Sequence, residues 1–107
     1  MLHVTRTDQV LVTEALACLD EALRTGRLDP DRRELQVLAL PSGGRLLVGR
    51  ANGHTLAVLR RDAPDTLAFD RLLEDEGVVA AVRSRQSGRR ALAALMIRLL
   101  ALQVMGM

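Results

Sequence analysis

Three apolar runs in the middle of the chain predict a small antiparallel sheet. Short glycine-containing segments separate these runs, which cover residues 35–40, 45–50 and 55–61. Asn52-Gly53, between the second and third runs, supplies the positive backbone φ that tight hairpin turns require. We therefore expect a three-stranded antiparallel meander over about 34–61. Both of its faces carry apolar residues, so one face can take a helix of the same chain and the other a further helix or a second subunit.

An amphipathic helix is predicted before the sheet, over residues 8–25. Its leucines and valines recur at helical spacing on one face, as Val12, Leu16 and Leu19 do, while its acidic residues lie elsewhere. Gly26 provides a natural stop for this helix. The polar segment 27–33 then predicts a loop.

A second helix is predicted after the sheet, over residues 65–76. Pro64 suits its first turn and Gly77 ends it. The apolar run 78–82 follows, and its β-branched residues favour a short edge strand. A continued helix fits the same residues, so both readings stay open.

A third helix is predicted over residues 89–105, and it is apolar almost all round. A helix without a polar face needs burial on more than one side, and large exposed apolar surfaces usually mark interfaces. We therefore expect a second copy of the chain to cover part of this helix; a central core helix within one chain is the alternative. The residues assigned to this dimer interface are Leu92, Leu95, Met96, Leu99 and Leu102.

The predicted helices and strands indicate an α+β fold, and the length indicates a single domain over residues 1–107. Hydrophobic residues make up 49% of the chain, which argues against disorder. Phe69 is the only aromatic residue, so the core must consist of Leu, Val, Ala and Met. Cys18 is the only cysteine, which excludes an internal disulfide and suits the reducing cytoplasm.

Charge is unevenly distributed, although the formal net charge is only +2. Residues 62–76 are strongly acidic, whereas 83–107 carry five arginines and no acid. Four of these arginines fall in the predicted polar linker 83–90, where guanidinium groups can bind carboxylates or phosphates. We expect this segment to bind an acidic protein surface, with nucleic acid as the alternative. The residues assigned to this role are Arg83, Arg85, Arg89 and Arg90.

Residues that could carry catalysis or bind a metal are few. The histidines are His3 and His54, and with one cysteine they offer no metal-ligand cluster at a familiar spacing. Cys18 falls on a predicted buried face, where a thiol is inert. We therefore expect no catalytic residue, cofactor or metal. The apolar segment 91–105 is too short to span a bilayer comfortably and contains Arg98, which argues against a membrane anchor.

A resemblance to a known family adds to this reading. The segments that carry it are the helix before Gly26, the strand 34–40, the turn Ser42-Gly43-Gly44, the segment 45–50, the turn Asn52-Gly53, the strand 55–59 and the segment 62–65 that leads into the next helix. Together, residues 7–82 resemble the second half of a Roadblock (dynein light chain-type) domain. Such domains are non-enzymatic, dimerise, and regulate or scaffold small GTPases. The predicted order of elements also resembles secretion-chaperone-like dimers.

These observations lead to two functional hypotheses. The first is a non-catalytic, homodimeric protein-interaction module, either a Roadblock-like regulator or scaffold of a partner such as a small GTPase, or chaperone-like. The second is a nucleic-acid-binding protein that uses the arginines of 83–90. The near absence of aromatic residues argues against recognition of single strands, which depends on base stacking.

Overall fold

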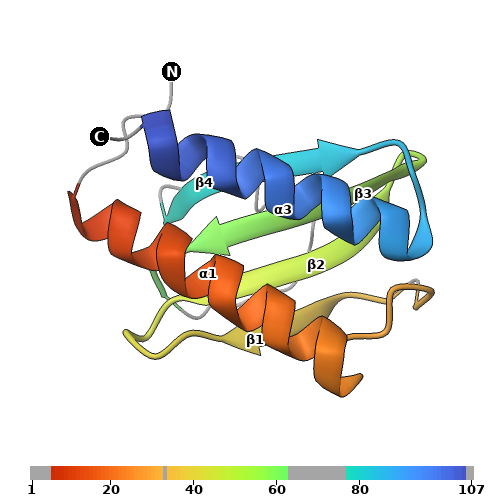
Figure 1. The fold of residues 1–107 in the computed structure, drawn as a ribbon, viewed down its shortest axis with the longest axis horizontal. Coiled ribbons are helices and arrows are strands. Elements are labelled where there is room, and N and C mark those ends of the chain that lie inside the picture. Colours follow the sequence, from red (N-terminus) through yellow and green to blue (C-terminus); the bar gives the residue numbers. More distant parts are fainter. Residues whose placement is uncertain (1–5, 33, 63–76, 106–107) are drawn as a thin grey trace.

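The computed structural model of this chain describes residues 6–32, 34–62 and 77–105 (Figure 1). Two helices lie side by side across a sheet in the described part of the chain (Figure 1). The elements in chain order are α1 (Arg6–Thr25), β1 (Gln36–Ala39), β2 (Arg45–Ala51), β3 (His54–Arg60), β4 (Val78–Ser84) and α3 (Gly88–Met105). The predicted α+β class is confirmed, as are the helices near both ends of the chain. The predicted helix over 65–76 lies outside the described residues.

The described strands form one antiparallel sheet in the order β1-β2-β3-β4. The β2–β3 hairpin turns at Asn52 and Gly53, whose φ values are 52° and 77°. Two successive positive φ values match the type I′ turn that suits the twist of antiparallel strands. The sequence signal for this hairpin is therefore confirmed.

The sheet has a fourth strand, where the main prediction was three. The run 78–82 is strand, and β4 continues to Ser84, so the linker expected to begin at Arg83 is shorter than predicted. Antiparallel pairing with β3 places Ala57 opposite Val82 and Leu59 opposite Ala80. These four side chains are buried on one face, which explains why an alternating apolar run of this length prefers a strand.

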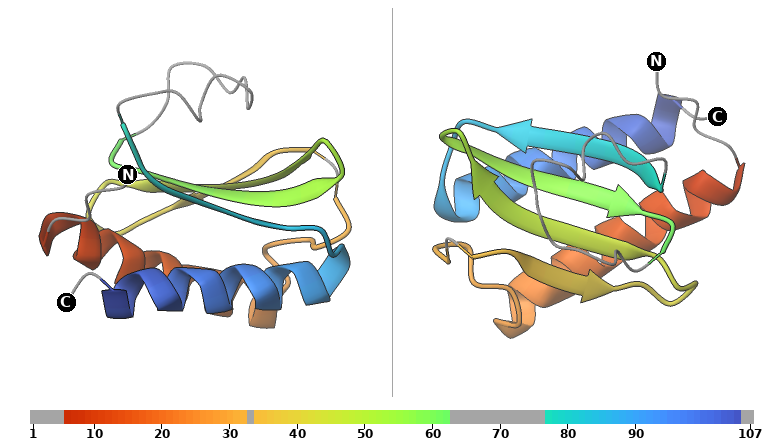
Figure 2. Two further views of the ribbon diagram at one scale, coloured as in Figure 1. Left: turned by 90° about the horizontal axis from the view of Figure 1, so that it is seen from above. Right: turned by 180° about the vertical axis from the view of Figure 1, so that it is seen from behind.

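Both described helices cover the same face of the sheet (Figure 2). They run in opposite directions, with the end of α3 beside the start of α1 (Figure 1). Gln9 Nε2 donates to the backbone oxygen of Leu102 at 3.4 Å, and Gln103 Nε2 donates to Thr13 Oγ1 at 2.6 Å. The layer of α1 and α3 is called the helical layer below.

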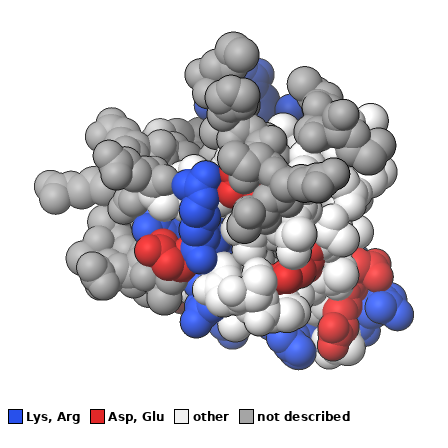
Figure 3. All heavy atoms as spheres, turned by 90° about the vertical axis from the view of Figure 1, so that its left-hand side faces the viewer, with Lys and Arg blue, Asp and Glu red and all other residues white. Residues whose placement is uncertain are grey.

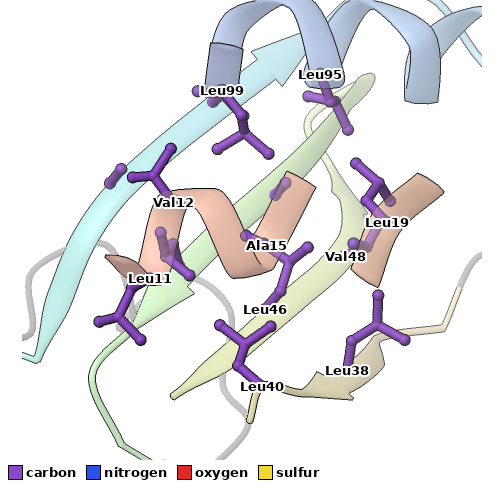
Figure 4. Packing of buried hydrophobic residues seen from close by; sticks show 14 of the residues in the cluster. Leu11, Val12, Ala15, Leu19, Leu38, Leu40, Leu46, Val48, Leu95 and Leu99 are labelled. Carbon is purple, nitrogen blue, oxygen red and sulfur yellow. The ribbon is translucent and has the colours of Figure 1, made fainter. Parts of the chain in front are cut away.

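The core lies between the helical layer and the sheet. Leu95 and Leu99 of α3 point into the same cluster as Val12 and Leu19 of α1 and Val48 of β2 (Figure 4). The opposite face of the sheet is also apolar, as predicted. There Leu47 and Val58 are fully buried, and Leu35 and Val78 pack against them.

The structure corrects the assignment of Leu92, Leu95 and Leu99 to a dimer interface. Their side chains are only 1%, 0% and 1% exposed, because the sheet and α1 of the same chain already cover them. Met96 and Leu102 are half-buried against the same cluster. A second copy cannot reach the three leucines in this fold, so the alternative of a core helix within one chain is correct for this side of α3.

Candidate functional site

The four arginines predicted to bind a partner lie around one end of the fold. All four side chains are exposed. Arg83 pairs with Leu56 in the sheet register. Its neighbour Val82 belongs to the core under the helical layer, and side chains alternate along a strand, so Arg83 lies on the face away from the helical layer. Arg89 and Arg90 belong to the first turn of α3, and Arg85 lies between the two elements. The structure therefore brings them to the same end but not onto one surface.

These arginines keep their charges available to a partner. None of the four forms an ion pair in the described ranges 6–32, 34–62 and 77–105, and neither does Arg98. The described stretch from Gly77 to Met105 carries five arginines and no acidic residue. Guanidinium groups remain charged at every physiological pH. This end of the protein therefore presents a persistent positive charge.

A hydrogen-bonded chain fixes the connection between β4 and α3. Arg50 Nη1 donates to Thr55 Oγ1 at 3.1 Å, and Thr55 Oγ1 donates to the backbone oxygen of Gln86 at 3.2 Å. The backbone nitrogen of Gln86 in turn donates to Ser84 Oγ at 3.1 Å. Thr55 and Ser84 are both only 6% exposed, so these bonds are partly shielded from water. This series of hydrogen bonds connects the β2–β3 hairpin to the segment just before α3.

An open hollow of about 540 Å³ lies beside this connection. Its described lining consists of Pro30, Asp31, Arg50, Gly53, Ser87 and Gly88. Asp31 lies close to the start of α3: its Oδ1 atom is 3.3 Å from the position that a Cβ on Gly88 would take. The lining offers a guanidinium, a carboxylate and a hydroxyl, which can hydrogen-bond a polar group.

Neither Cys18 nor His54 is among the described residues that line the hollow. Burial raises the pKa of the Cys18 thiol, and nearby Glu21 and Glu14 raise it further. A thiol that stays protonated at neutral pH is a weak nucleophile. His54 Nδ1 lies 3.1 Å from the backbone oxygen of Asn52, in the same turn. No group of three or more potential metal ligands occurs among the described residues.

The outer side of the helical layer carries an apolar stripe that the sequence analysis missed. Ile97, Leu100 and Val104 of α3 are 67%, 51% and 62% exposed, and Val10 of α1 is 53% exposed. Ala93 and Ala101 are also exposed and share this side of α3 at helical spacing. We call the exposed residues Val10, Ala93, Ile97, Leu100, Ala101 and Val104 the helical face.

A sequence signal for the helical face did exist. At 100° per residue, Arg89 and Arg90 project within about 60° of Ala93, on the same side as Ile97 and Leu100. Arginine near the start of a helix normally faces water. The two arginines therefore mark the outward side of α3, although the apolar residues alone do not distinguish the two sides.

An ion pair between a buried carboxylate and a half-exposed arginine, at the opposite end of the molecule, was also missed. Asp8, in the first turn of α1, is 1% exposed and accepts two hydrogen bonds from Arg61, which follows β3. Arg61 Nε lies 3.2 Å from Oδ1, and Nη2 lies 3.1 Å from Oδ2. Figure 3, which looks at this end, shows described basic and acidic side chains next to each other. The pair connects α1 to the sheet.

Comparison with known proteins adds no relative. No family model matches the chain, and neither a curated protein nor a solved structure matches it. The Roadblock resemblance therefore stays a prediction. None of the helices in the described ranges is long and apolar enough to cross a membrane.

Proposed function

We propose that this chain is a non-catalytic protein-interaction module that pairs with a second copy through the helical face. The observation that carries the proposal is the division of α3 into two apolar sides. One side of α3 is buried in the core of the same chain, through Leu92, Leu95 and Leu99. The opposite side of the helix is apolar and exposed. Contiguous exposed apolar surface on a small protein usually marks an interaction site.

The exposed fractions set the expected strength of pairing. Covering Ile97, Leu100 and Val104 contributes about 3–4 kcal/mol per copy, taking about 2 kcal/mol for each whole side chain and scaling by exposure. Two copies gain about 7 kcal/mol, against an association cost of at least about 4 kcal/mol. The proposal is therefore a weak dimer that forms with rising concentration rather than an obligate one.

The arginine-rich end supplies a second surface in this proposal. Four arginines lie around the end of the fold that carries the open hollow: Arg83, Arg85, Arg89 and Arg90. None of them has an ionic partner within the described part of the chain. An acidic protein surface is the partner that their charge favours. A regulator or scaffold of another protein, such as the Roadblock resemblance implies, would bind its partner at this end, with Arg83 on the face away from the helical layer, while pairing through the helical face.

Sedimentation velocity across a range of concentrations tests the pairing. We expect the mass to rise from 11.7 kDa toward twice that value as the protein is concentrated. The double variant Ile97→Glu/Leu100→Glu should stay at the mass of one chain. Val37→Glu is the matched control, because Val37 is an exposed valine, 43% accessible, on the far strand β1. A wild-type protein that remains a single chain at millimolar concentration contradicts the proposal.

Nucleic-acid binding is the second candidate function. The observation in its favour is the run of five arginines without an acid between Gly77 and Met105. Phosphate contacts of this kind weaken steeply as salt rises, because binding releases counterions. Fluorescence anisotropy with a labelled duplex at low salt should then show binding that Arg89→Ala/Arg90→Ala weakens. No binding at low salt removes this candidate.

A further inference from the structure

We infer that the two copies stack α3 of each on α1 of the other, with the twofold axis running along the helices. The inference rests on the proposed function, because it assumes that the helical faces meet. Two helical layers in contact can be related by a twofold axis in two limiting orientations. One axis runs parallel to the helices and the other crosses them.

The antiparallel order of α1 and α3 makes the two orientations different. An axis along the helices places α3 of one copy over α1 of the other, and the stacked helices run in opposite directions. An axis across the helices places α3 on α3 and α1 on α1, also in opposite directions. The pairing of residues therefore differs completely between the two dimers.

Contacts within one chain fix which residues lie at the same level. Gln9 meets Leu102 near one end of the layer, and Arg24 and Arg89 line one shallow hollow near the other. Rotation about an axis along the helices preserves these levels. Val10 of the second copy then faces the turn of α3 between Leu100 and Val104, so exposed apolar residues meet each other.

The same rotation brings opposite charges together at the other end of the layer. Asp20 and Glu21 of the second copy lie within about one helical turn of the level of Arg89 and Arg90. Arg24 of the second copy reaches the level of Arg89 itself, so two acids and one arginine face the two arginines there. Within one chain, Asp20 forms an ion pair with Arg24 at 3.2 Å and Glu21 forms one with Arg27 at 3.8 Å. More than half of each of these four side chains is exposed, and exposed pairs of this kind contribute little and can be exchanged.

The crossing axis is disfavoured by the charge of α3. This helix contains three arginines and no acid, so stacking α3 on α3 gathers six positive charges without compensation. By contrast, α1 from Gln9 to Thr25 carries three acids and one arginine. Stacking α3 on α1 therefore pairs a basic helix with an acidic one.

The size of the contact makes this charge difference decisive. α3 has 18 residues and is about 27 Å long, and two helices about 10 Å apart present a face of roughly 500–600 Å². Stable dimers usually bury about 800 Å² per copy. Because the apolar contact is below that size, the arrangement with favourable charges should dominate.

Disulfide cross-linking distinguishes the two axes. Two single-cysteine proteins are made in a Cys18→Ser background, Ala17→Cys on the outer side of α1 and Ala93→Cys on the outer side of α3. Ala17 and Ala93 are both exposed. The contact of Gln9 with Leu102 and the hollow shared by Arg24 and Arg89 place them within about one helical turn of the same level. We expect oxidation to give a covalent dimer when the two proteins are mixed, and little from either protein alone. A mixture of Val37→Cys and Ala93→Cys is the control and should not cross-link above background.

The possible outcomes separate the inference from the proposed function. Strong cross-linking of Ala17→Cys alone identifies the crossing axis and overturns the inference, while pairing through the helical face survives. A dimer in sedimentation that none of these mixtures captures also overturns it. Failure to form any dimer defeats the proposed function itself.

A charge exchange gives an independent measurement. Arg89→Glu/Arg90→Glu should weaken the dimer by about tenfold or more in dissociation constant, since four acids then face one another at each of the two symmetry-related contacts. Adding Asp20→Arg/Glu21→Arg to the same chain should restore most of the affinity. No recovery in this quadruple variant contradicts the proposed stacking of α3 on α1.

Discussion

Leu99 and Leu100 offer a direct test of how α3 is used, because they are adjacent, identical residues with opposite surroundings. Leu99 is 1% exposed and belongs to the core, whereas Leu100 is 51% exposed on the helical face. Leu99→Ala and Leu100→Ala make the same chemical change in the same helix turn. Helix propensity therefore cancels between the two variants, and the difference reports burial.

The structure gives the expected size of each effect. Leu99→Ala removes three buried carbon groups at about 0.8 kcal/mol each and leaves a cavity, so the free energy of unfolding should fall by about 3–4 kcal/mol. Leu100→Ala removes groups that water already reaches, and its cost should be about 1 kcal/mol or less. The effect of Leu100→Ala on the proposed dimer is measured separately, at high protein concentration.

Urea unfolding at low protein concentration measures the difference. With a denaturant dependence of about 1.5 kcal/mol per M, Leu99→Ala should lower the midpoint by about 2 M and Leu100→Ala by well under 1 M. At high concentration, Leu100→Ala should instead reduce the mass seen in sedimentation. Equal midpoint shifts for the two variants at low concentration would refute the packing of α3 described here.

Two further predictions concern residues outside α3. Asp8→Asn should lower the free energy of unfolding by about 1–3 kcal/mol, because it weakens the charge-assisted hydrogen bonds from Arg61 to a buried carboxylate. Asp20→Asn, at an exposed ion pair, should change the free energy of unfolding by less than about 1 kcal/mol. Equal melting temperatures for the two variants contradict this prediction. Burial raises the pKa of Cys18, so the pH midpoint of thiol labelling should be higher for the folded protein than for the urea-unfolded protein, and coincident midpoints contradict it.

The sequence was most informative where structure depends on neighbouring residues. The Asn52-Gly53 turn was predicted correctly because a positive φ is a property of one or two residues. The helix near residues 8–25 was predicted because its polar and apolar sides are distinct in the sequence. The run 78–82 allowed a strand but could not require one, since its pairing with β3 joins residues about 20 positions apart.

The position of the candidate surface could not be obtained in the same way. Leu95, Leu99 and Leu100 have the same chemistry and all lie in an apolar segment, so periodicity does not say which of them faces the sheet. Arg89 and Arg90 mark the outward side of the helix, but the placement of α3 against β3, β4 and α1 is what buries Leu95 and Leu99 and leaves Leu100 exposed. The pair between Asp8 and Arg61, 53 positions apart, likewise exists only in the folded chain.

For this protein the sequence by itself determined the fold class, most element boundaries and the concentration of arginine between 77 and 105. The tertiary structure decided which side of α3 remains open and how the arginines are distributed around one end of the fold. The physical reason is that turns and helix ends depend on local backbone preferences, whereas burial depends on which distant segments meet.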